Sequence, residues 1–153
     1  MVAAGGFVGW SGDIHAYGGA HPNGTIGGCA GTIYRKDGAY GVVIVDNNGK
    51  SVKESYGADI PSQNSDSMDF FRSLNLVLSN GGAVTLTQNL KINDINLAAS
   101  KAVLNLNQYV LTVMSGAHKN GKHWAPDASV TSKTVEGVTG EIIWPSGLLI
   151  SIK

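Results

Sequence analysis

Short runs in which apolar and polar residues alternate recur through the middle of the chain, and their spacing limits the folds that the chain can adopt. One series of runs begins at Leu74, Leu90 and Tyr109, and a second series, interleaved with the first, begins at Val84 and Val103. The intervals are 16 and 19 residues in the first series and 19 residues in the second. Two interleaved series with similar spacing predict an all-β fold, a parallel β-helix or β-solenoid with two or more strands in each coil.

Polar residues with a high turn tendency separate these runs. They include residues 79–82 (Ser-Asn-Gly-Gly), residues 88–89 (Gln-Asn) and residues 107–108 (Asn-Gln). Successive coils of a solenoid stack about 4.8 Å apart, and a corner can gain or lose residues without shifting the stacked strands. We therefore expect Gly- and Asn-rich corners around a core of stacked Leu, Ile and Val.

The composition favours a β protein with many turns. Glycine contributes 21 of the 153 residues, and charged residues make up 14% of the chain, against about 25% in ordinary soluble domains. An antiparallel β-sandwich is the alternative, because its strands recur about every 8 to 12 residues. The pair Asn48-Gly49 would serve either fold, since it is also a strong hairpin signal.

Three Gly-rich motifs follow one another in the N-terminal half. They are residues 16–19 (Ala-Tyr-Gly-Gly), residues 27–34 (Gly-Gly-Cys-Ala-Gly-Thr-Ile-Tyr) and a β run over residues 40–49 that ends in Asp-Asn-Asn-Gly. This order resembles a unit repeated in very large bacterial surface and secreted proteins, and residues 74–114 resemble the coils that follow the unit. The resemblance implies a right-handed parallel β-helix like those of adhesins and autotransporter passenger domains, and it brings no catalytic residues with it.

The chain has the length of one domain. We expect a single domain over residues 1–153, with solenoid coils at 5–115, a loop at 116–140 and C-terminal strands at 141–153 that close the fold. A solenoid needs covered ends, and the first residues of the chain offer no obvious cap.

The charge balance bears on possible partners. Eleven basic and eleven acidic residues give a net charge of +0, which lacks the positive surface that nucleic acid requires. A net charge near zero also removes one barrier to self-association. No apolar stretch predicts membrane insertion. The lone cysteine, Cys29, has small neighbours and is expected to be a packing residue.

No pattern in the sequence predicts a metal or cofactor. His118 and His123 lie five residues apart near Asp127, but the short, fixed spacing of a zinc site is missing, and His15 and His21 lie in a Gly-rich segment. Residues 46–49 (Asp-Asn-Asn-Gly) lack the further ligands of a calcium loop and are interpreted as a turn.

An enzyme that cleaves polysaccharides would need two carboxylates held close together. The spacings of the available acidic residues do not require such a pair: Asp59, Asp66, Asp69, Asp94, Glu136 and Glu141. The motifs of hydrolases and nucleotide-binding enzymes are also missing. We therefore expect no enzymatic activity, and a carbohydrate-active enzyme fragment is the less favoured alternative.

Aromatic residues outside the predicted strands give a second functional hypothesis. Exposed aromatic rings can stack on sugar rings. Tyr56 and Trp124 lie in predicted loops and are the candidate glycan-binding residues of an adhesin module. The same residues could instead fill the core or pack against an end of the fold.

The sequence thus favours a non-catalytic structural module located outside the cell or on its surface. It would act as a stiff rod, and its partners would be neighbouring repeats or further copies of itself stacked head to tail into filaments. Glycan binding through Tyr56 and Trp124 is the alternative.

Overall fold

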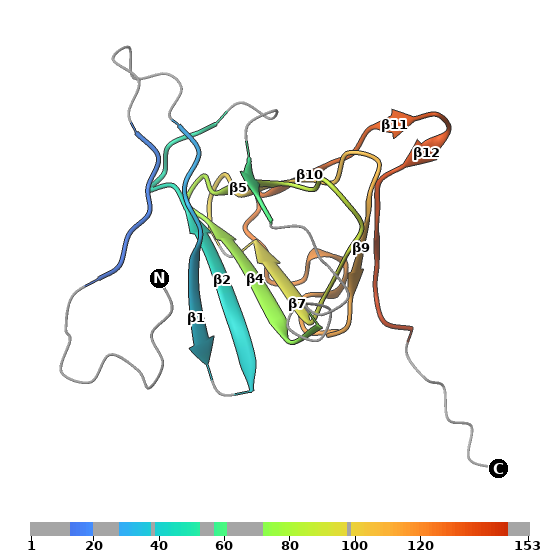
Figure 1. Ribbon diagram of the computed structural model, residues 1–153, viewed down its shortest axis with the longest axis horizontal. Helices are drawn as coiled ribbons and strands as arrows, with labels where there is room; N and C mark the ends of the chain where they lie inside the picture. The colour runs from blue at the N-terminus through green and yellow to red at the C-terminus, as the bar shows by residue number, and fades with distance from the viewer. Residues whose placement is uncertain are drawn as a thin grey trace.

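The computed structural model describes residues 13–19, 28–37, 39–52, 57–60, 72–97 and 99–146 (Figure 1). These residues form short strands and one 3₁₀ turn, η2 (Lys119–Gly121). The strands are β1 (Ile33–Asp37), β2 (Tyr40–Asp46), β3 (Ala58–Asp59), β4 (Leu74–Ser79), β5 (Ala83–Thr85), β6 (Leu90–Ile92), β7 (Asp94–Leu97), β8 (Val103–Asn105), β9 (Val110–Val113), β10 (Ser129–Thr131), β11 (Thr134–Val135), β12 (Val138–Thr139) and β13 (Glu141–Ile143).

Three sheets and one hairpin contain all of these strands. The first sheet has the order β1-β2-β4-β7, the second β10-β8-β5-β3 and the third β13-β9-β6, while β11 and β12 form a hairpin. Strands pair in parallel across each sheet except between β1 and β2, and the β11–β12 hairpin is antiparallel. Because the parallel pairs join strands that are distant in sequence, each sheet combines segments from several parts of the chain.

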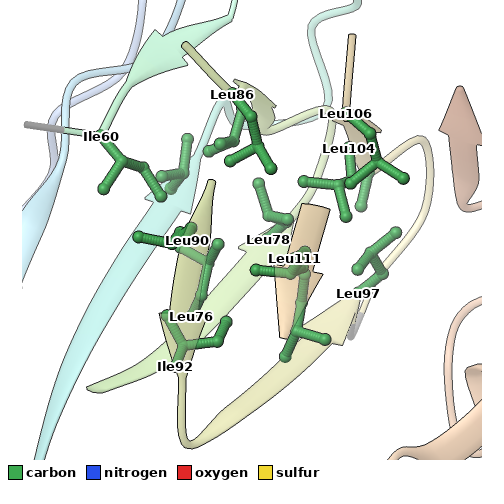
Figure 2. Close-up of a cluster of buried hydrophobic side chains, with 14 of the residues drawn as sticks. Ile60, Leu76, Leu78, Leu86, Leu90, Ile92, Leu97, Leu104, Leu106 and Leu111 are labelled. Carbon is green, nitrogen blue, oxygen red and sulfur yellow. The ribbon is translucent and has the colours of Figure 1, made fainter. Parts of the chain in front are cut away.

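The inward faces of the three sheets meet in one apolar core (Figure 2). Burial alternates along the longer strands, as in β4, where Leu74, Leu76 and Leu78 are buried and the residues between them are partly exposed. In-register neighbours such as Leu76 and Ile95 are both fully buried. The alternating apolar pattern therefore identifies the inward face correctly, as expected for strands with one buried face.

The prediction of a right-handed parallel β-helix is wrong. The sheets are short, they mix parallel with antiparallel pairing, and they do not join into a closed or solenoid sheet. The interval between paired residues also varies: it is 19 residues from Leu76 to Ile95, 33 from Val43 to Leu76, and 31 from Leu111 to Ile142. The regular spacing of residues 74–109 does not extend to either side of that region.

The tight corner that connects β4 of the first sheet to β5 of the second explains two turn residues. Asn80 and Gly81 have positive φ angles of 47° and 78°, a conformation that Gly and Asn adopt more readily than other residues. Backbone hydrogen bonds stack this corner on its neighbours, from Gly49 N–H to Asn80 O and from Gly81 N–H to Ser100 O.

Residues 129–139, within the segment predicted to be a loop, contain β10, β11 and β12.

Candidate interaction surface

Trp124, one of the two predicted glycan-binding residues, lies partly buried against the core beside β7. Its indole Nε1 donates a hydrogen bond to Ile95 O at 3.2 Å, and the N–H of Ala125 donates to Leu97 O at 2.9 Å. Its ring centroid lies 6.0 Å from that of Trp144. Trp124 therefore helps to cover the outer edge of β7. Tyr56, the other predicted residue, lies outside the described part of the chain.

His118 is a further link between the loop of residues 115–125 and β7. Its Nδ1 lies 2.7 Å from Asp94 Oδ2, and the two side chains are 18% and 14% exposed. His123 makes an edge-on ring contact with His118 at 6.3 Å. Asp127, the expected neighbour of these histidines, instead accepts a hydrogen bond from Ser100 Oγ at 2.6 Å. Among the described residues, no group of three or more His, Cys, Asp or Glu could hold a metal ion.

Asp46 and its neighbours form a turn that ties two corners together. Its Oδ1 accepts a hydrogen bond from the N–H of Asn48 at 2.8 Å, and its Oδ2 accepts one from Ser79 Oγ at 2.8 Å and one from Asn80 Nδ2 at 2.7 Å. Burial raises the pKa of Asp46, but the three donors outweigh it and hold the pKa below its ordinary value. The carboxylate therefore contributes to stability in its charged form.

Acidification should test this contribution. Because the folded-state pKa of Asp46 is lowered, its stabilisation is complete above the unfolded-state pKa of about 3.9 and is lost as the pH falls through the folded-state value. We expect D46N to reduce the free energy of unfolding at pH 7 by less than about 1 kcal/mol, since the group is partly exposed, and to weaken the loss of stability below about pH 4. Urea denaturation at several pH values between 3 and 7 measures the free energy of unfolding and its pH dependence. The variant E136Q, at the exposed Glu136, is the control. An unchanged acid dependence in D46N would show that Asp46 is not responsible.

The strands β10 and β13 lie at the edges of the second and third sheets, each paired with one strand only in the described part of the chain. Val130 of β10 stands in register with Leu104, which stands in register with Val84. Along this inward-facing row the exposed fraction is 0% for Val84 and Leu104 but 38% for Val130. The core row thus reaches the surface at β10.

Further aliphatic side chains are exposed in the same segment. Val135 is 42%, Val138 54% and Ile143 45% exposed. The two valines are register partners in the β11–β12 hairpin, which projects from the body of the protein in Figure 1. We call residues 129–143, which include β10 to β13, the C-terminal edge surface. An exposed apolar surface beside unpaired strand edges is typical of a docking site.

The sequence does not predict this surface, because residues 116–140 are expected to form a loop. One signal was present. The segment Thr134 to Thr139 reads Thr-Val-Glu-Gly-Val-Thr, in which β-branched residues flank a Glu-Gly turn on both sides. Glu136 and Gly137 have positive φ angles of 51° and 82°, as a tight hairpin turn requires.

No helix among the described residues is long and apolar enough to cross a membrane. Comparison of the chain with protein families, with characterised proteins and with solved structures gave no match.

Proposed function

We propose that this protein is a non-catalytic structural module that acts outside the cell or on its surface and attaches to a neighbouring β structure through the C-terminal edge surface. One observation carries the proposal: Val130 continues a fully buried core row yet is 38% exposed. A strand docked on β10 would bury this side chain and pair with the edge of β10 that carries no strand among the described residues.

The charged and polar groups described above support a structural role. Asp46 holds a turn, Asp94 and His118 hold a loop on β7, and Asp127 is bonded to Ser100. Each of these three carboxylates thus bonds to a neighbour within the fold, through one oxygen only in Asp94, whose Oδ1 is buried without a hydrogen-bond partner. The zero net charge and the resemblance to repeated units of bacterial surface proteins both support association of the protein with other modules rather than existence as an isolated monomer.

Self-association should therefore depend on Val130. We expect the protein to associate measurably at concentrations between about 1 and 100 μM. V130D should raise the dissociation constant by roughly tenfold or more, because a charge would be buried within the contact. Sedimentation velocity over that range measures both. Tyr40, 45% exposed on β2, supplies the control variant Y40D.

Two results would contradict the proposal. One is a protein that stays monomeric throughout this range and binds no other surface component. The other is association that V130D and Y40D weaken equally, since the contact would then lie elsewhere. Thermal unfolding of both variants establishes that each remains folded.

A further inference from the structure

We infer that the partner of the C-terminal edge surface is a second copy of this chain, bound about a two-fold axis through antiparallel pairing of β13 with β13 of the partner, centred on Ile142. This inference rests on the proposed function and specifies the partner and its register. Three features of the described residues carry it: the direction of the β13 backbone groups, the distribution of charge along β13 and the ending of the first sheet.

The hydrogen-bond pattern of β13 directs the backbone N–H and C=O of Ile142 away from β9, while the Ile142 side chain is partly buried against the core. Glu141 is in register with Val110 of β9, and its N–H donates to Tyr109 O at 3.3 Å. In a parallel ladder alternate residues bond to the same neighbour, so Glu141 and Ile143 face β9 while the N–H and C=O of Ile142 point away from it. Two copies related by a two-fold axis at Ile142 would exchange both of these hydrogen bonds.

Charge along β13 is distributed so that antiparallel pairing is favourable. At its start lie Glu141 and, on the adjoining hairpin turn, Glu136, and both are exposed. Beyond its end, Lys119 Nζ donates a hydrogen bond to Pro145 O at 3.0 Å, and the exposed Lys122 follows on the same loop. Antiparallel pairing brings the acidic start of one β13 to the basic end of the partner's β13, and the two-fold axis repeats this contact. It also lays the two edge surfaces face to face and covers Val130.

Both edges of the first sheet are unsuited to the head-to-tail stacking expected from the sequence. At one edge, β1 pairs antiparallel with β2 and ends the parallel order. At the other edge, Trp124 and Ala125 bond to β7 and cover it. A closed two-fold contact uses only the edges of β10 and β13 that are left unpaired in the described part of the chain, and two-fold contacts are also the commonest in homo-oligomers.

Disulfide trapping tests the register. In a C29A background, which removes the native thiol, I142C should form a disulfide-linked dimer on mild oxidation, because residues opposite each other in a hydrogen-bonded antiparallel pair have Cα atoms about 5.5 Å apart. The matched control is I143C in the same background. Its two Cα atoms would lie about 8 Å apart in this register, beyond disulfide reach. Non-reducing electrophoresis at a concentration at which the protein associates gives the result.

Charge reversal tests the same arrangement without a new cysteine. E141K and K119E should each associate about three- to tenfold more weakly than the unmodified protein. Their equimolar mixture should recover the original affinity, because every contact across a mixed dimer is again between opposite charges. The effect should diminish at high salt.

The outcomes separate this inference from the proposed function. Trapping of I142C alone, with recovery in the mixture, supports the two-fold contact. If V130D weakens association but I142C is not trapped more efficiently than I143C, the surface is a docking site and the two-fold register is wrong. Growth into filaments overturns the closed dimer in favour of head-to-tail stacking. A protein that stays monomeric and binds no other surface component overturns the proposed function itself.

Discussion

Replacing Asn47 with alanine should lower the free energy of unfolding by about 3 kcal/mol. Asn47 is 0% exposed, and all of its described hydrogen bonds reach the backbone. Its Oδ1 accepts from the N–H of Gly18 at 2.9 Å, and its Nδ2 donates to Gly28 O at 3.2 Å and to Lys50 O at 3.0 Å. N47A would leave three backbone groups without this partner, at about 1 kcal/mol or more for each one that stays buried.

The same substitution should loosen the N-terminal segments before the rest of the fold. Residues 13–19 and 28–31 bond to each other through Gly28 N–H to Gly19 O and Gly31 N–H to Ala16 O. Asn47 is a point at which both segments join the corner after β2. In hydrogen exchange, the amides of Gly18 and Gly31 should therefore lose protection in N47A while those of β8 keep theirs.

The neighbouring Asn48 provides the control. It is exposed and has a φ of 53°, which glycine adopts without strain, so N48G should change the free energy of unfolding by about 0.5 kcal/mol or less. Urea denaturation of both variants measures these changes. If N47A lowers the free energy of unfolding by less than about 1 kcal/mol, water replaces the side-chain amide at little cost and the role assigned to Asn47 is wrong.

The part of the fold that the sequence predicts best is the part with regular alternation. Leu74, Leu76 and Leu78 are buried along β4, and Leu90 and Ile92 along β6, as their spacing indicates. A period of two is a direct consequence of strand geometry, so it is read from local sequence with little ambiguity. The assignment of these segments to strands therefore needed no knowledge of their partners.

The partners themselves could not be predicted from the same pattern. The sense and register of pairing depend on contacts between distant residues, such as Val43 with Leu76 and Leu111 with Ile142. Where the chain inserts a hairpin, as at Val135 and Val138, the interval changes without altering the alternation elsewhere. The expectation of a regular solenoid rests on a few similar intervals, and the irregular intervals lie in segments with weaker patterns.

The candidate sites show the same limit. Trp124 is a candidate from the sequence because it stands in a loop without apolar periodicity, yet its indole is bonded to Ile95 O and packs against the core. An aromatic residue in a loop sequence carries no sign of what lies above or below its ring. The exposure of Val130 was equally hidden, because it follows from the position of β10 at the end of its sheet.

Replacing Leu104 with alanine should also lower the free energy of unfolding strongly. This residue lies at the centre of β8, between Val84 and Val130 in the second sheet, and it is 0% exposed in the core (Figure 2). L104A removes a buried isobutyl group and leaves a cavity, which should lower the free energy of unfolding by about 2 to 5 kcal/mol. Equilibrium urea denaturation measures the loss.

Val130 supplies a control from the same row. V130A removes fewer atoms from a side chain that is already 38% exposed, so the monomer should lose less than about 1 kcal/mol. Association should respond in the opposite order: V130A should weaken it, while L104A, measured where it remains folded, should leave it nearly unchanged. Similar losses of stability in the two variants would mean that Val130 is already covered within the monomer. The core row would then end inside the protein, and the argument for a docking surface at β10 would fail with it.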